Sequence, residues 1–187
     1  LHYLALERMA SAWESGKPAI DLWLPSVTLG YPLYHHYQHL PYVVQTIFYL
    51  FLPDAVTLPN LFRWSNYLLL SFFPLSIYWS MRHFGFARLT AAMSGLVASL
   101  LATHGLYGFD FSSYLWSGYG LYSQVWGMFF LPPALAAGTV YLRTGRGIVL
   151  STLLLAATAL SHLLLGYMAL LSLVALFFIP LFGPSME

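Results

Sequence analysis

The stretch IVLSTLLLAATALSHLLLGYMALLSLVALFFIPLF, residues 148–182, decides the fold class of this chain. It contains no Asp, Glu, Lys or Arg, and it is longer than the roughly 17–25 apolar residues with which one helix crosses a membrane. Ser161, His162 and Gly166 interrupt it near its middle. We therefore expect two spans, at about 148–165 and 166–182, joined as a tight hairpin or as one broken helix.

Three further apolar stretches, at about 64–81, 87–103 and 124–142, have the length of a membrane-spanning helix. The composition agrees, because 59% of residues are hydrophobic and only 7% are charged, whereas soluble domains carry about a quarter charged residues. So few charges cannot cover a water-exposed globule. The sequence predicts an all-α fold, a polytopic membrane helical bundle over residues 61–187.

Charge bias orients the predicted bundle. Two of the predicted connections are flanked by arginines, which are Arg82 with Arg88 and Arg143 with Arg146. The positive-inside rule places both connections in the cytoplasm. Residues 106–123, which contain no Lys or Arg, then face the outside, as do Arg63 and everything before it. Residues 41–52 are apolar but short for a span. Because the segments on both sides of them face the outside, we expect them to lie in the membrane interface.

Residues 1–60 are predicted to form an extracytoplasmic loop with two amphipathic juxtamembrane helices, at about 3–15 and 41–52. In the first, apolar Leu4 and Met9 alternate with charged Glu7 and Arg8, as in a helix that lies on a membrane surface. Gly16-Lys17-Pro18 stops this helix. Since the chain opens inside the amphipathic pattern, we expect it to be a fragment that lacks a first transmembrane helix.

Composition also excludes several classes of function. The chain has no cysteine, which excludes disulfides, thiolate metal sites and a cysteine nucleophile. A net charge of +1 from seven basic and six acidic residues leaves no basic face for nucleic acid. No Gly-rich phosphate loop or Ser-centred elbow is present.

Histidines form the first candidate site. His35, His36 and His39 lie within YHHYQH, and if the segment is helical then His35 and His39 share a face at a spacing that can chelate a metal ion. Alternatively these side chains only bond to backbone and water. His104 and His162 lie near the outer ends of predicted spans, where an ionisable group is a functional candidate or else joins helices by a hydrogen bond worth about 1 kcal/mol.

Two acids complete the candidates. Asp110 is the only acid in the outer connection 106–123, and Asp21 lies in AIDLW of the first loop. Each carboxylate could bind a divalent ion or a basic group, or it could cap a turn.

The order of these elements resembles the first extracytoplasmic loop of GT-C superfamily glycosyltransferases, which include protein O-mannosyltransferases, the lipid A aminoarabinose transferase and oligosaccharyltransferases. The residues that carry this resemblance are Gly16-Lys17-Pro18, Asp21-Leu22-Trp23, Leu29-Gly30-Tyr31-Pro32-Leu33 and Tyr37-Gln38-His39-Leu40-Pro41-Tyr42. Ser117-Gly118-Tyr119, followed by Pro132-Pro133, is similar to the second outer loop of oligosaccharyltransferase catalytic subunits. Where that family has a carboxylate pair, this chain has Leu121 and Ser123, followed by Gln124.

The resemblance implies transfer of a sugar from a polyprenyl-phosphate donor to an acceptor, at the extracytoplasmic side of a plasma or inner membrane. It makes Asp110, or a carboxylate upstream of Leu1, the catalytic base. It also implies a substrate-binding set and a divalent metal ion as a candidate cofactor, with His35 and His39 as its ligands. The substrate-binding candidates are Asp21, His35, His36, His39, Arg63, Gln124 and His162.

Two alternatives remain open at this point. A non-enzymatic membrane subunit or scaffold could use His162 to ligate a haem or a chlorin, or simply to hold helices together. A transporter is supported only by the interruption at 161–166, and its coupling ions would lack ligands because the interiors of the spans hold no Asp, Glu, Lys or Arg.

Overall fold

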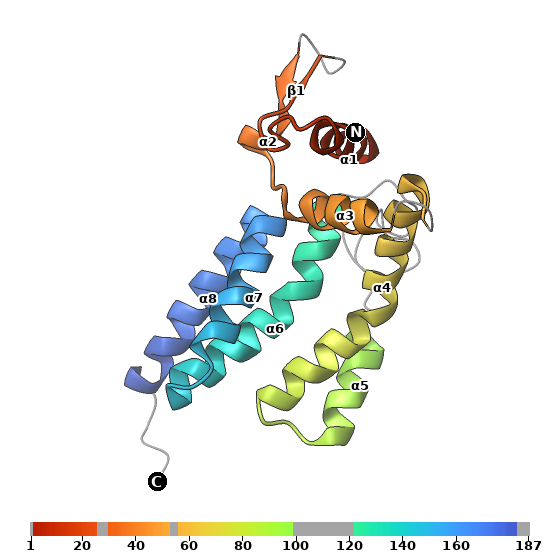
Figure 1. Cartoon of the computed structure of the whole chain (residues 1–187). Coiled ribbons are helices and arrows are strands. Elements are labelled where there is room, and N and C mark those ends of the chain that lie inside the picture. Colours follow the sequence, from red (N-terminus) through yellow and green to blue (C-terminus); the bar gives the residue numbers. More distant parts are fainter. Residues whose placement is uncertain (1, 26–29, 53–55, 99–121, 183–187) are drawn as a thin grey trace. The chain divides into compact units, whose positions relative to one another are not determined.

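The computed structural model describes residues 2–25, 30–52, 56–98 and 122–182 (Figure 1). Within these ranges the chain is mostly helical, with 81% of residues in eight helices, as the predicted all-α class requires. It folds as two compact units, unit 1 (Leu1–Leu68) and unit 2 (Leu69–Glu187), and helix α4 (Leu58–His83) contributes to both.

Unit 1 begins with helix α1 (His2–Glu14), whose inner face buries Ala5, Leu6 and Met9. The helix ends in a Schellman arrangement. Gly16 adopts a φ of 67°, its N–H donates to the Trp13 carbonyl, and the N–H of the next residue donates to the Ala12 carbonyl at 2.8 Å. Glycine reaches this left-handed conformation without steric cost, which explains how Gly16-Lys17-Pro18 stops the helix where the sequence predicts a stop.

A small hairpin follows, in which β1 (Trp23–Leu24) pairs antiparallel with β2 (Tyr31–Pro32). It leads into the short helix α2 (Leu33–His36) and then into α3 (Leu40–Phe51), against which α1 packs. Helix α3 is amphipathic, since Tyr42 and Thr46 are buried while Phe48 and Phe51 are 55% and 81% exposed.

The first turns of α4 belong to unit 1. The Gln45 side-chain amide of α3 donates to the Ser65 hydroxyl, and the rings of Tyr3 and Phe62 meet edge to face at 6.1 Å. Helix α4 thus starts at Leu58, inside the predicted loop of residues 1–60, and the division between the units falls after Leu68.

Unit 2 contains α5 (Arg88–Ala98), α6 (Tyr122–Thr144), α7 (Ile148–Ser161) and α8 (Leu163–Phe182) together with the rest of α4. Helices α6, α7 and α8 pack against one another. Helix α5 covers the first part of the predicted span 87–103, whose end lies outside the described residues.

The chain reverses sharply between α7 and α8. The backbone of His162 is extended, and a Cβ built on Gly166 would lie 2.6 Å from the Ala159 Cα. Of the two predicted forms, a tight hairpin or one broken helix, the structure has the hairpin. Helix α7 ends at Ser161, four residues before the predicted end of the span at residue 165. The prediction placed this end too late because residues 163–165 are as apolar as the helix before them.

Helices α4 and α6 run parallel. Phe73 packs against Val125, and one turn further along both helices the Ser76 hydroxyl donates to the Phe129 carbonyl at 2.7 Å. Because the second contact lies one turn further along both α4 and α6, the two helices run in the same direction. The two arginine-bearing turns, 84–87 after α4 and 145–147 after α6, therefore lie at the same end of unit 2, the lower end in Figure 1.

Large apolar side chains of unit 2 face outward, while small and hydroxyl side chains face inward. Leu153, Leu164 and Leu171 are 63%, 64% and 67% exposed. The buried positions of α6 and α7 include Ala134, Ala136, Ala137, Thr139, Ser151, Thr158 and Ser161. A water-soluble bundle shows the opposite distribution.

By length and composition, one described helix, α6, could cross a membrane, and three apolar helical segments are shorter: α3, α7 and residues 163–178 of α8. The predicted spans at 64–81, 124–142 and 166–182 fall within α4, α6 and α8.

Replacing Gly166 should destabilise the α7–α8 hairpin. A Gly166→Val side chain would collide with the Ala159 backbone, which cannot move without opening the turn. We expect a loss of roughly 1–3 kcal/mol, the usual cost of overpacking, seen as a lower midpoint of thermal unfolding by circular dichroism. The exposed Ala175→Val of α8 is the matched control. Equal midpoints for the two variants would contradict the close approach.

Candidate functional site

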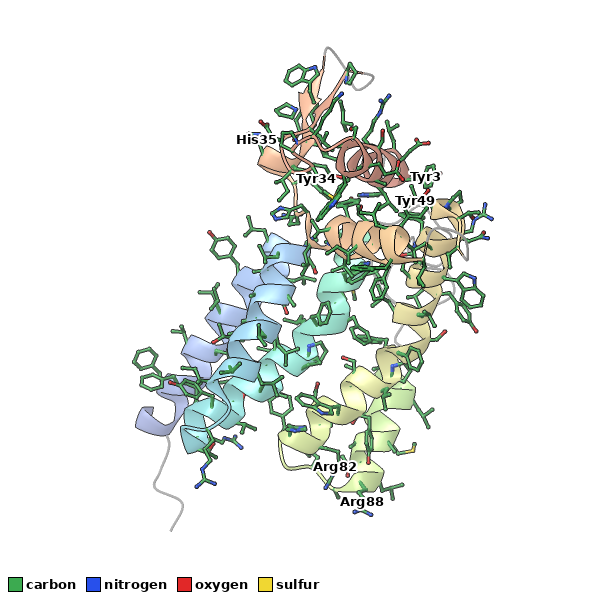
Figure 2. The ribbon with its side chains drawn as sticks, viewed as in Figure 1. Tyr3, Tyr34, His35, Tyr49, Arg82 and Arg88 are labelled. Carbon is green, nitrogen blue, oxygen red and sulfur yellow. The ribbon has the colours of Figure 1, made fainter. Side chains whose placement is uncertain are left out.

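The structure brings two of the predicted site residues together in unit 1. Asp21 lies just before β1 and His35 lies in α2, just after β2, so the pairing of Trp23 with Pro32 places them side by side. The His35 Nε2 lies 2.6 Å from the Asp21 Oδ1. Both side chains are open to solvent, at 53% and 73% exposure, and His35 lies at the surface of unit 1 in Figure 2.

This Asp21–His35 pair has the arrangement of an oriented imidazole. The carboxylate accepts a hydrogen bond from Nε2–H, which leaves Nδ1 to accept a proton from another molecule. None of the described residues bonds to Nδ1 of His35. An exposed ion pair contributes at most about 1 kcal/mol to stability, so the contact acts mainly to hold the ring in one orientation.

The predicted metal pair does not have its expected geometry. Helix α2 ends at His36, Tyr37 is extended, with φ of −131° and ψ of 146°, and α3 begins anew beyond His39. Pro41 explains the break, because proline is tolerated in the first turn of a helix but not in its interior. His35 and His39 therefore do not share a helical face.

No group of three or more potential metal ligands occurs among the described residues. Of the other predicted candidates, the side chain of His36 and all of His104 and Asp110 lie outside the part of the chain that the structure describes.

An aromatic cluster on the inner face of α1 was not among the predicted sites. The His2 Nδ1 and the Tyr42 hydroxyl are hydrogen-bonded at 2.6 Å. The hydroxyl of Tyr34, which Figure 2 labels, donates to the Ala5 carbonyl at 2.9 Å. Burial is the main cause that lowers the pKa of His2 to about 4, and it also raises the pKa of Tyr34. The signal that sequence reasoning overlooked is that His2 shares the apolar face of α1 with Leu6.

Arg63 lies in a second part of unit 1, on the outer face of α4. Asn60, Arg63, Trp64 and Tyr67 line a shallow pocket of about 270 Å³. The rings of Trp64 and Tyr67 meet edge to face, with centroids 5.4 Å apart. All four side chains are exposed.

His162 contacts α6 in unit 2, one turn beyond Gln124. A Cβ built on Gly127, one turn after Gln124, would lie 2.7 Å from the His162 Cβ. Two buried polar groups at this level, the Trp126 indole N–H and the Ser161 hydroxyl, have no hydrogen-bond partner among the described residues. Because α6 runs from Gln124 to Arg143, this polar region lies at the opposite end of α6 from the arginine-bearing turn.

No family model, curated protein or solved structure matches this chain. The resemblance to GT-C glycosyltransferases therefore stays a prediction that rests on the residues quoted for it.

Acid should weaken unit 1 through His2. The His2 imidazole has a pKa of 6.5 in the unfolded chain and of about 4 in the folded chain. Stability is therefore complete above pH 6.5 and falls by up to roughly 3 kcal/mol as the pH drops towards 4.

The measurement is urea unfolding at pH 7 and pH 4.5, compared with His2→Gln. Protonation of carboxylates affects both proteins equally, whereas protonation of His2 affects only the parent chain. The variant should therefore lose less stability on acidification than the parent chain does. The same loss in both would contradict a buried, neutral His2.

Proposed function

We propose that this chain forms part of a polytopic membrane glycosyltransferase of the GT-C kind, which transfers a sugar from a polyprenyl-phosphate donor to an acceptor on the extracytoplasmic side. The Asp21–His35 pair carries the proposal. Asp21 stands in one motif of the resemblance and His35 lies between two others, and the hairpin of unit 1 holds the two side chains 2.6 Å apart on an exposed surface.

The packing of unit 2 supports the membrane part of the proposal. Lipid tails are as apolar as leucine, so helices in a bilayer associate through small residues and interhelical hydrogen bonds. The buried alanines and hydroxyls of α6 and α7, the glycine contacts at Gly127 and Gly166, and the exposed leucines fit that environment.

The parallel packing of α4 and α6 supports the proposed orientation. With this packing, the turns after α4 and α6, which follow Arg82 and Arg143, lie at one end of unit 2, as the positive-inside rule requires of two cytoplasmic connections. The charge bias of the sequence and the packing of the helices are separate observations, and both support this orientation.

The chemistry of sugar transfer suits the Asp21–His35 pair. The bond from the sugar C1 to the donor phosphate breaks, the phosphate leaves with the electron pair, and a bond forms from C1 to the acceptor oxygen. The acceptor hydroxyl must lose a proton, which Nδ1 of a neutral His35 is free to accept. A protonated His35 would instead stabilise the negative charge on the departing phosphate.

Helix α3 supplies a surface for the lipid part of such a donor. Phe48 and Phe51 are exposed on its outer face, in the same unit as the Asp21–His35 pair. An exposed aromatic face on a helix without charged residues suits the interface between headgroups and hydrocarbon.

Removing the imidazole should abolish most transfer. In membranes that contain the full-length protein, His35→Gln should lower the transfer of labelled sugar from polyprenyl-phosphate donors about 100-fold or more, the usual worth of a general base. Asp21→Asn should lower it less, because the ring is kept and only its orientation is lost. His83→Gln, at the α4–α5 turn, is the matched control and should retain activity. Unchanged turnover in His35→Gln would refute the proposed role.

The proposed orientation can be tested with single cysteines, because the chain has none of its own. In intact cells, an impermeant maleimide should label Glu14→Cys of α1 and should label Thr144→Cys, at the end of α6, only after permeabilisation. Both positions are exposed, so access depends on the membrane alone. Labelling of Thr144→Cys in intact cells would contradict the orientation.

A further inference from the structure

The pocket on the outer face of α4 has the make-up of an anion site with an apolar floor. Asn60, Arg63, Trp64 and Tyr67 occur at the spacing of successive turns along one side of the helix. The arginine supplies a fork of N–H donors, the asparagine supplies an amide, and the two rings supply a flat apolar wall.

Arg63 is available to a ligand. None of the described carboxylates lies within ion-pairing distance of it, and its side chain is exposed. A guanidinium binds phosphate oxygens through two parallel N–H bonds, a geometry that lysine cannot reproduce. The charge of the pocket thus favours an anionic ligand with at least two oxygens.

The position of the pocket along α4 points to a lipid as the source of that anion. Leu68, one turn after Trp64, is 43% exposed, and residues 69–81 of α4 contain no charged residue. Tryptophan, tyrosine and arginine at the start of an apolar helix are typical of the level where lipid phosphates lie.

The pocket is shallow and measures about 270 Å³, close to the lower end of the roughly 300–1,000 Å³ typical of small-molecule sites. A phosphate with a small substituent, as on a structural phospholipid, fits this volume.

We infer that Asn60, Arg63, Trp64 and Tyr67 form a binding site for the headgroup of an anionic phospholipid of the surrounding membrane, with Arg63 on the phosphate and the rings against the glycerol. This inference rests on the membrane location in the proposed function and does not depend on sugar transfer.

The test counts lipids bound to the purified full-length protein by native mass spectrometry, during titration with phosphatidylglycerol from a neutral detergent. Arg63→Gln should weaken the tightest binding step at least tenfold. Arg63→Lys should weaken it less, and Trp64→Leu should weaken it a few-fold. Lys17→Gln removes the same charge from an exposed site elsewhere in unit 1 and should bind as the parent protein does. Circular dichroism checks that each variant is folded.

Two competition measurements distinguish the possible sources of the anion, and one variant distinguishes this site from the proposed catalytic site. Inorganic phosphate at millimolar concentration should not compete with the lipid, and polyprenyl phosphate should compete no better than phosphatidylglycerol does. His35→Gln should bind lipid normally even where it transfers no sugar, which separates this site from the proposed catalytic one. Equal lipid binding in Arg63→Gln, saturation by inorganic phosphate alone, or much tighter binding of polyprenyl phosphate would each overturn the inference.

Discussion

The parallel packing of α4 against α6 is the constraint on which the arrangement of unit 2 depends. The bond from the Ser76 hydroxyl to the Phe129 carbonyl, with Phe73 against Val125 one turn earlier, sets both the direction and the level of the two helices. Because both helices end in an arginine-bearing turn, the charges collect at one end. Gln124 and His162 are thereby left at the other end of α6, away from those charges.

Close helix contact makes this arrangement possible without large buried side chains. At Gly127 and Gly166 the neighbouring chain lies where a Cβ would be, so the helices approach nearer than bulkier residues would permit. The leucines that would fill the core of a soluble bundle are free to face outward. The inverted distribution of side chains and the tight α7–α8 turn therefore have one cause, which is the placement of glycine, alanine and hydroxyl residues on the facing surfaces.

Much of the secondary structure could be predicted from the sequence, because long uncharged apolar runs and a glycine stop are local signals. Gly16-Lys17-Pro18 ends α1 as expected, and the runs at 64–81 and 124–142 lie in helices. The predictions that were wrong concerned features that hydropathy does not indicate. The end of α7 at Ser161 rather than near residue 165 is not marked by hydropathy, because residues 163–165 are apolar. The break between α2 and α3, which falls between His35 and His39, removes their helical spacing. Contacts between distant segments, such as Asp21 with His35, required the hairpin register.

The two best-defined histidines of unit 1 show why burial, more than residue type, separates a structural group from a chemical one. His2 lies on the inner face of α1 against Tyr42, where desolvation lowers its pKa and favours the neutral ring. His35 lies at the surface, with a carboxylate on one nitrogen and the other nitrogen open. A sugar acceptor must bring its hydroxyl to within hydrogen-bonding reach of the base, so only His35 of these two meets the first requirement of catalysis. Helical spacing places His2 on the apolar face of α1 with Leu6, which is a local signal of burial. The position of His35 beside Asp21 has no such local signal, because it depends on the pairing of the two hairpin strands.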